Sequence, residues 1–392
     1  MFWGAASRAG TYNLTTSGAA NCDGGPSRAL ELVAADSGET WAVYPPDGYG
    51  AAILNGQADA NYDTDQLGIN TGVCIGSGIA QPITFNGLQF ENFGFVGIAT
   101  LSTVIVTNNI FHHSYTQSTS AYASSLIIYD GSGSIVSHNY IHDMNGNGIS
   151  VVSATNGGMN NLSIDHNFIN NVCVTDSDCG AIQTADYAPN SSTNMTISYN
   201  YIRDVYTARG GVAVGGGGGG IGIYFDDSTT NVTAVGNIVT GLTGSCFLYH
   251  ENANNVVTGN ICDLSAGAAN GTLVYVNQPK SIATDPTRGQ TGLIFQNNVL
   301  VCKPASGNCG NTTFQSYTSF SGVTGNTADG PTNSNNAYWN YSGGTVNDNC
   351  GNYQGPACHG SPPADTNPTT ENPQISCWAV TIPATARSSP RP

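Results

Sequence analysis

Short runs of alternating apolar and polar residues recur along the chain, and most of them end in asparagine followed by one or two apolar residues. One run reads Leu162-Ser-Ile-Asp-His-Asn167-Phe-Ile, and the next reads Met195-Thr-Ile-Ser-Tyr-Asn200-Tyr-Ile. Alternation with a period of two places Val, Ile and Phe on one face of a β-strand. The runs end at these asparagines: Asn86, Asn109, Asn139, Asn167, Asn200, Asn237, Asn260 and Asn298.

The spacing of these asparagines predicts a solenoid. Successive members are 23 to 38 residues apart, which is enough for about three short strands and their turns, with insertions of variable length. One such unit cannot bury its apolar face alone, whereas stacked units bury a continuous core. Asparagine suits a turn that visits the left-handed region, and stacked amide side chains can hydrogen-bond along the axis. A propeller is disfavoured because its blades of about 40–50 residues carry signatures that this chain lacks.

We therefore predict an all-β, single-domain, right-handed parallel β-helix with a loop-rich C-terminal cap. The segments 32–45 and 52–57 fit its opening coils, and Asn335-Asn336 marks one last coil. The predicted boundaries are 1–343 for the β-helix and 344–392 for a Pro/Gly/Cys-rich cap and tail.

Charge narrows the classes of partner. The 392 residues include 9 Lys and Arg against 25 Asp and Glu, for a formal net charge of −16. A nucleic-acid-binding protein needs a basic surface that neutralises phosphates, and this chain cannot supply one. Long-range repulsion also disfavours a polyanionic substrate, so a neutral ligand fits better. The chain has no apolar run of 18 residues, so we expect no membrane partner. We also expect a monomer.

Cysteine usage favours an oxidising compartment. The chain has 11 cysteines, an odd number that leaves at least one unpaired within it. Several cysteines lie only six to eight residues apart in the sequence, a spacing that is typical of loop disulfides in secreted proteins. The closely spaced pairs are Cys173/Cys179, Cys302/Cys309 and Cys350/Cys358. We predict a secreted protein.

A column of carboxylates appears when the strand before each asparagine run is aligned on its first apolar residue. Asp186, Asp227 and Glu251 then occupy one position, and Asp226 and His250 occupy the position before it. Adjacent coils are about 4.8 Å apart, so these groups should be close neighbours. Cleavage of a glycosidic bond needs one acid and one base or nucleophile, which a carboxylate pair can supply. The alternative is structural, because Asp and Asn also cap backbone amides at turns.

The sequence resembles β-helical glycoside hydrolases, a group that includes xylanases, β-xylosidases and α-L-fucosidases. The resemblance spans roughly residues 10–300 and rests on the stretches Gly222-Ile-Tyr-Phe-Asp-Asp-Ser-Thr-Thr-Asn231 and Gly180-Ala-Ile-Gln-Thr-Ala-Asp186, and on the opening segment from Asp36 to Gly56. It implies acidic residues on successive coils that act as acid/base and nucleophile. By position, Asp227 would be the nucleophile or base, and Glu251 or Asp186 the proton donor.

Residues around this column are candidates for substrate binding. Aromatic rings stack well on sugars, and Arg209 opens a glycine-rich segment that could close over the site. The candidate binding residues are Asp226, His250, Tyr224, Tyr187, Tyr206 and Arg209.

No metal or cofactor is required by this chemistry. His138 and His166 each precede a repeated asparagine, and we interpret them as residues that stack on each other rather than as metal ligands. Calcium is the one cation that the acidic pattern leaves open, although no full calcium-loop motif is present. The candidate positions are Asp59, Asp63 and Asp65, or Asp176 with Asp178.

Three functions remain on sequence grounds. The leading hypothesis is a glycoside hydrolase acting on a neutral, xylan-like polysaccharide or oligosaccharide. The second is a polysaccharide lyase or uronan epimerase, which Arg203 and Arg209 keep open because such enzymes neutralise a uronate. The third is a non-catalytic carbohydrate-binding solenoid, in which the acidic column is turn chemistry alone.

Overall fold

The structure is a computed structural model, and it describes most of the repeat region. The described residues are 10–13, 30–32, 40–42, 52–55, 71–75, 81–93, 96–114, 124–129, 131–153, 159–175, 178–186, 192–206, 220–250, 252–265, 272–278, 292–303, 314–318, 331–343, 365 and 367–373. Within these ranges every helix or strand is a β-strand.

The strands form three parallel sheets, which we call the first, second and third sheets. The first sheet contains β1 (Gly10–Asn13), β4 (Ala52–Asn55), β7 (Leu88–Phe93), β10 (Ile110–Ser114), β13 (Tyr140–Met144), β16 (Phe168–Val172), β19 (Tyr201–Val205), β22 (Ile238–Leu242), β25 (Ile261–Asp263), β28 (Val299–Cys302) and β31 (Ala337–Asn340). The second sheet contains β2 (Leu30–Leu32), β5 (Thr71–Ile75), β8 (Val96–Thr100), β11 (Ser124–Tyr129), β14 (Asn147–Ser153), β17 (Gly180–Asp186), β20 (Ile221–Asp226), β23 (Ser245–His250), β26 (Thr272–Gln278) and β29 (Phe314–Thr318). The third sheet contains β3 (Thr40–Ala42), β6 (Ile83–Asn86), β9 (Val104–Thr107), β12 (Ile135–Ser137), β15 (Ser163–Asp165), β18 (Met195–Ser198), β21 (Val232–Val235), β24 (Val256–Thr258), β27 (Ile294–Gln296) and β30 (Thr332–Ser334).

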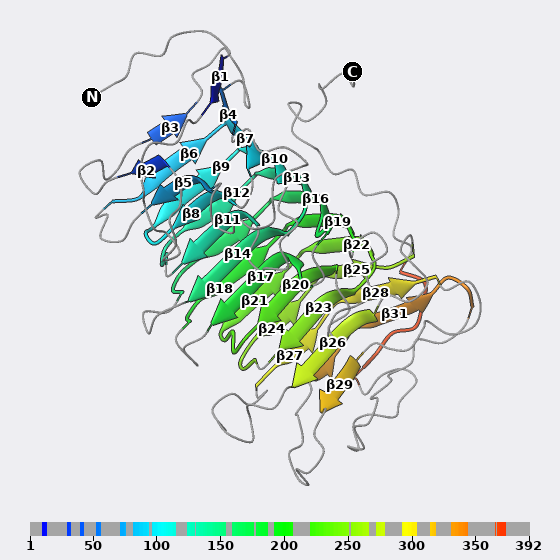
Figure 1. Cartoon of the computed structure of the whole chain (residues 1–392). Coiled ribbons are helices and arrows are strands. Elements are labelled where there is room, and N and C mark those ends of the chain that lie inside the picture. The colour runs from blue at the N-terminus through cyan, green and yellow to red at the C-terminus, as the bar shows by residue number, and fades with distance from the viewer. Residues whose placement is uncertain are drawn as a thin grey trace.

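Each coil contributes one strand to each sheet, so the chain is a parallel β-helix (Figure 1). The predicted strand alignment is confirmed in the second sheet, where Ile182 pairs with both Ile149 and Ile223, and Ile223 pairs with Phe247. These residues are fully buried because alternation points them into the solenoid. The next inward pair, Phe225 and Tyr249, stacks with ring centroids 5.2 Å apart.

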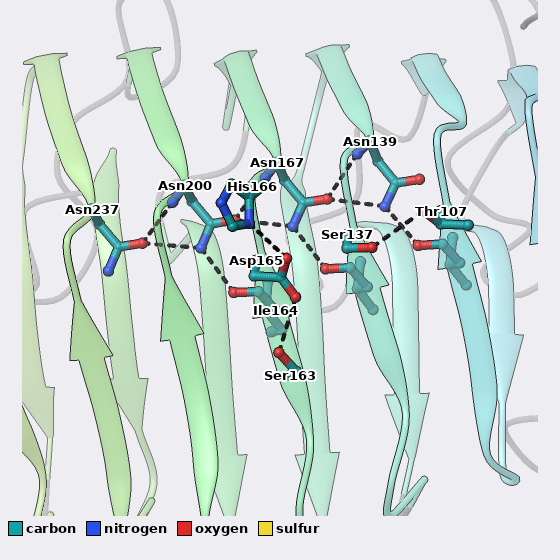
Figure 2. Close-up of polar contacts among 12 residues, drawn as sticks. Thr107, Ser137, Asn139, Ser163, Ile164, Asp165, His166, Asn167, Asn200 and Asn237 are labelled. Carbon is teal, nitrogen blue, oxygen red and sulfur yellow. Dashed lines mark hydrogen bonds and ion pairs between the residues drawn. The ribbon is translucent and has the colours of Figure 1, made fainter. Parts of the chain in front are cut away.

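Buried asparagines form a continuous hydrogen-bonded ladder between the third and first sheets (Figure 2). Asn167 Nδ2 donates to Asn200 Oδ1 at 2.9 Å and to the carbonyl of Val136 at 2.9 Å. Its Oδ1 accepts from the backbone and side-chain amides of Asn139, at 3.0 and 2.9 Å. Each ladder asparagine therefore hydrogen-bonds with buried backbone groups of the neighbouring coil, which would otherwise lack a partner.

Two details of the predicted ladder were wrong. Asn86 pairs with Thr107 in the third sheet, and the ladder position of that coil is Leu88, whose amide donates to Asn109 Oδ1 at 2.9 Å. The left-handed residue is the one before each ladder asparagine, as at His138 (φ 56°). The ladder asparagine itself has to turn its amide inward, so its neighbour makes the turn.

The last coil is covered by a short piece of the C-terminal segment. The predicted coil at Asn335-Asn336 is confirmed by β30 and β31. Asp365 Oδ2 accepts from Asn336 Nδ2 at 2.7 Å and from Tyr338 Oη at 2.9 Å, and so ends the ladder. Thr369 bridges to Ala337 as an added strand residue.

Two disulfides have both cysteines in the described region. The predicted Cys173–Cys179 bond is present, and Cys246–Cys262 joins β23 to β25, a pairing that spacing did not suggest. Cys302 is also disulfide-bonded, whereas Cys309, Cys350 and Cys358 lie outside the described residues. A search of the described residues found no helix that is long and apolar enough to cross a membrane.

Candidate functional site

The turn that follows β20 carries the candidate site. Asp227 (φ 29°) and Ser228 (φ 61°) both adopt left-handed backbone, which residues other than glycine rarely do. Thr229 fixes this turn, because its Oγ1 donates to the carbonyl of Asp226 at 2.6 Å or to that of Thr184 at 2.9 Å. The turn therefore holds two successive carboxylates at the edge of the second sheet.

Asp226 is the centre of a polar cluster. Its Oδ2 accepts from Gln183 Nε2 at 2.8 Å, and its Oδ1 accepts from the Asp227 amide at 2.9 Å. Oδ1 also lies 2.5 Å from His250 Nδ1 on the next coil, and Asp227 Oδ1 lies 3.6 Å from the same nitrogen. The exposed fractions of the side chains are 8% for Asp226, 30% for Asp227 and 19% for His250. A buried carboxylate thus orients an imidazole beside a more accessible carboxylate.

A chain of hydrogen bonds reaches this cluster across the second sheet. Gln183 Oε1 accepts from Asn147 Nδ2 at 2.5 Å. Asn147 Nδ2 also lies 3.0 Å from Ser150 Oγ, which is 2.6 Å from Ser124 Oγ. All four side chains are buried on the outer side of the sheet. Because each polar group has a partner, the network fixes Gln183 and through it Asp226.

Asp178 joins the cluster from the coil before. It directly precedes Cys179 of the Cys173–Cys179 disulfide. Although the residue is exposed as a whole, its carboxyl group hydrogen-bonds with Tyr224. Burial of that carboxyl group and repulsion from Asp226 raise the pKa of Asp178 above its ordinary value.

Tyr224 points outward as predicted, but it is covered rather than open to a ligand. Only 6% of the residue is exposed, and it packs with Ile221 and Leu248. A Cβ on Gly180 would lie 2.9 Å from Tyr224 Cβ, so the absence of a side chain there makes room for the ring. Burial and the nearby Asp226 and Asp178 carboxylates raise the pKa of Tyr224 well above its usual range. Tyr224 therefore stays neutral, and its hydroxyl hydrogen-bonds with both carboxyl groups.

Asp186 lies in the predicted column but faces into the protein. It is fully buried, and its Oδ2 accepts from the Ser192 amide at 3.1 Å and from Ser192 Oγ at 2.8 Å. Its own amide donates to the carbonyl of Asp227 at 2.8 Å. The predicted closeness to Asp227 therefore holds for the backbone, while the carboxylate caps the turn that precedes β18.

Of the remaining predicted site residues, one follows a strand of the first sheet and three lie outside the described residues. Tyr206 follows β19 of the first sheet, where its hydroxyl donates to Asp204 Oδ1 at 3.2 Å. The expectation that it shares a face with Tyr224 was wrong, because β19 and β20 belong to different sheets. Glu251, Tyr187 and Arg209 lie outside the described residues.

Sequence reasoning missed three members of the cluster: Asp178, Gln183 and Asn147. Gln183 could have been found, because the strand alignment places it one coil from Tyr224 on the outward face. The sequence indicates Asp178 only as a candidate calcium ligand, with Asp176. Asp178 lies beside the Cys173–Cys179 disulfide and outside the repeating strands, so no periodic pattern predicts its contact with Tyr224.

The site could also hold a cation. Asp226, Asp227 and His250 each offer one ligand atom, and these atoms all lie within 4.8 Å of one another. Mixed carboxylate and imidazole ligands suit transition metals better than calcium, which prefers oxygen alone.

A second group of ionisable residues lies on the outer face of the first sheet. His112 stacks on His142 with ring centroids 5.0 Å apart, and its Nε2 lies 3.3 Å from Glu91 Oε2. Burial, together with the neighbouring His142 and His113, lowers the pKa of His112 to about 3. A hydrogen bond from His142 lowers the pKa of Asp143 to about 2.

This group predicts acid sensitivity. The unfolded chain protonates His112 near pH 6.5, whereas the folded chain does so only near pH 3. The unfolded state therefore binds more protons between these values, and the free energy of unfolding falls as the pH falls, by up to about 1.4 kcal/mol per pH unit. We expect His112→Asn to weaken this slope in urea unfolding curves recorded between pH 4 and 7. The fold tolerates asparagine at this strand position, since His112 aligns with His142 on the next coil and with Asn170 on the coil after that. An unchanged slope would contradict this account of His112.

Comparison with known proteins extends the description of the fold. The family model described as "Right handed beta helix region" matches residues 68–262, a span that includes Asp178, Asp226, Asp227 and His250. The fold is a right-handed parallel β-helix. The handedness expected from the sequence is thereby confirmed.

The chain is similar to several solved structures of low sequence identity, and no curated protein matches it in sequence. PfbA, a surface adhesin of Streptococcus pneumoniae, is 12% identical with a TM-score of 0.46, over 82% of this chain and 83% of its own. The mannuronan C-5 epimerase AlgE6 A-module of Azotobacter vinelandii is 13% identical with a TM-score of 0.44, over 90% and 92%. A tailspike protein of the E. coli bacteriophage HK620, in complex with a pentasaccharide, is 10% identical with a TM-score of 0.38, over 81% and 52%.

Proposed function

We propose that this protein is a secreted glycoside hydrolase that cleaves a neutral polysaccharide or oligosaccharide, with a xylan-like chain favoured. One observation carries the proposal: two carboxyl groups of unlike environment meet in one cluster. Burial raises the pKa of Asp178 above its ordinary value, while the Asp227 side chain is 30% exposed and its Oδ1 lies 3.6 Å from His250 Nδ1. Glycosidic cleavage requires one carboxyl group that stays protonated and one that is ionised, and the different environments of Asp178 and Asp227 favour this division.

Each residue then has a distinct role. Asp178 donates a proton to the leaving glycosidic oxygen. Asp227, the more accessible carboxylate of the turn, acts as the base that activates water or as the nucleophile at the anomeric carbon. The buried Asp226 positions His250, whose imidazole binds the substrate beside Asp227. We assign Asp186 to the turn and Tyr224 to holding Asp178, and the chemistry requires no metal.

Charge and disulfides support the substrate class and the location. A net charge of −16 disfavours a polyanionic chain by long-range repulsion. Within the described residues the basic side chains are Arg203 and Lys303, and Arg203 is paired with Asp204 at 2.6 Å on the first sheet. Disulfides persist in oxidising compartments, which supports secretion.

The His250–Asp226 pair favours a second candidate, a polysaccharide lyase or uronan epimerase. An imidazole oriented by a carboxylate is a suitable base for the proton beside a uronate carboxylate. The two candidates differ in product, because a lyase creates an unsaturated sugar and a hydrolase creates only a new reducing end.

Replacement of Asp178 tests the assigned proton donor. We expect Asp178→Asn to lower cleavage of an unactivated glycan by about 10²–10⁴-fold, because the leaving oxygen is no longer protonated. A nitrophenyl glycoside of the same sugar needs little protonation and should lose far less. In the wild type, activity should fall as the pH rises through the raised pKa of Asp178, and this fall should be absent in the variant.

Asp263→Asn, on the first sheet, is the matched control and should behave as wild type. Equal losses on both substrates in Asp178→Asn, or an unchanged fall at high pH, would remove Asp178 from the role of proton donor.

A further inference from the structure

A second group of potential ligands lies on the turn between the third and first sheets, away from the candidate active site. Asp165 ends β15, and His166 follows it at the turn position before ladder residue Asn167 (Figure 2). His138 holds the same position one coil earlier, before Asn139. Both histidines adopt left-handed backbone, with φ of 56° at His138 and 53° at His166. The buried ladder fixes the backbone of both turns.

The three side chains converge at the surface. The two imidazole rings stack with centroids 4.9 Å apart and planes 6° apart, which confirms the stacking predicted from the sequence. His166 Nδ1 lies 2.8 Å from Asp165 Oδ1, and Ser163 Oγ donates to Asp165 Oδ2 at 3.0 Å. One ligand atom from each of His138, Asp165 and His166 lies within 4.8 Å of the others.

We propose that His138, Asp165 and His166 form a binding site for a divalent transition metal ion such as Zn²⁺. Imidazole nitrogen and carboxylate oxygen are ligands that Zn²⁺ accepts, at about 2.0–2.2 Å, with water completing a tetrahedron. The stacked rings lie in nearly parallel planes, so both must turn before a nitrogen of each points at one ion, and the exposure of both histidines leaves room for that rotation. The Ser163 hydroxyl orients the carboxylate from behind, as outer groups do in metal sites.

Metal bound here would join two coils. β12 and β15 pair over only three residues each, and the ion would add a link between the turns that follow them. Tyr199 extends the stack, with its ring 5.3 Å from that of His166, and so restricts His166 from the far side. Binding should therefore raise the melting temperature of the whole chain, because the ion binds the folded state preferentially.

Isothermal titration calorimetry of chelator-treated, full-length protein with zinc sulfate, together with the melting temperature with and without zinc, tests the proposal. The variants are His138→Asn and His166→Asn, because asparagine already occupies this left-handed position at Asn108 and Asn297. We expect each variant to lose one bound equivalent, or to weaken it at least tenfold, and to lose the zinc-dependent rise in melting temperature. His113→Asn is the matched control, since His113 is also exposed and left-handed (φ 58°) but lies on the first sheet.

The Asp226/Asp227/His250 group must be separated from this site. Titration of His250→Asn supplies that separation, because the equivalent assigned to His138 and His166 should persist in it. The proposal is overturned if wild-type protein binds no zinc, if both turn variants keep the wild-type stoichiometry and affinity, or if His250→Asn alone removes all binding.

Discussion

Replacing Asp227 with asparagine should abolish glycan cleavage and leave the fold intact. The carboxylate is the more exposed of the two on the turn, at 30% of the side chain against 8% for Asp226, and loss of a base or nucleophile costs about 10²–10⁴-fold or more. Asparagine tolerates the left-handed backbone at this position. The release of reducing ends should therefore fall by at least about 10²-fold, with a melting temperature close to that of the wild type.

Asp186→Asn separates the sequence-based assignment from the structural one. Asp186 lies in the same predicted column, but its carboxylate is bound to Ser192. We expect this variant to lose thermal stability and to keep its activity per folded molecule. Full activity in Asp227→Asn, or a selective loss of activity in Asp186→Asn, would show that the wrong carboxylate has been assigned.

Removing one rung of the asparagine ladder should have the largest effect on stability. Asn298 Nδ2 donates to the carbonyl of Val257 at 3.0 Å, and its Oδ1 accepts from the amide and the side chain of Asn260, at 2.9 and 3.0 Å. Asn298→Ala removes these three buried hydrogen bonds, and each polar group left unsatisfied costs about 1–3 kcal/mol. We expect the free energy of unfolding to fall by about 3 kcal/mol or more, as measured by urea denaturation.

The neighbouring residue supplies the control. Asn297 is exposed and left-handed (φ 56°), and glycine occupies the same position at Gly236 and Gly259. Asn297→Gly should therefore change the free energy of unfolding by less than about 0.5 kcal/mol. Similar losses in Asn297→Gly and Asn298→Ala would mean that the turn, and not the buried amide, sets the stability.

Much of the fold can be predicted from the sequence, because each coil repeats the same pattern of apolar, polar and asparagine positions. The period-two alternation fixes which side chains face inward, and alignment on Ile182, Ile223 and Phe247 reproduces the observed strand pairing. The error at Asn86 arises because the coil of β6 and β7 has Leu88, and not asparagine, at the ladder position. Residue type alone therefore misplaced the ladder by two residues in that coil.

The candidate site could be predicted only in part. Register placed Asp226 beside His250, and these side chains meet at 2.5 Å. Side-chain direction at the strand end was beyond reach, because the left-handed pair Asp227-Ser228 breaks the alternation that register arguments use. The contribution of Asp178 could not be predicted either, since its hydrogen bond with Tyr224 involves a residue beside the Cys173–Cys179 disulfide and outside the repeating strands.

The two clusters on this solenoid differ in what surrounds them. A buried hydrogen-bonded network from Ser124 to Gln183 runs along the second sheet and ends at Asp226, which suits a site that must hold its geometry during a reaction. Around His166, the side chains are exposed and the backbone is fixed by the ladder. The first arrangement favours chemistry, and the second favours reversible binding of an ion.

The most direct measurement is product analysis of purified protein on a panel of neutral and acidic polysaccharides, in buffer that contains a chelator. Reducing ends and absorbance at about 235 nm are recorded together, for the wild type and for Asp227→Asn. The account predicts new reducing ends from a neutral glycan, with no rise in absorbance and no product from the variant. A rise in absorbance on a uronate polymer, or no product from any glycan, would contradict it.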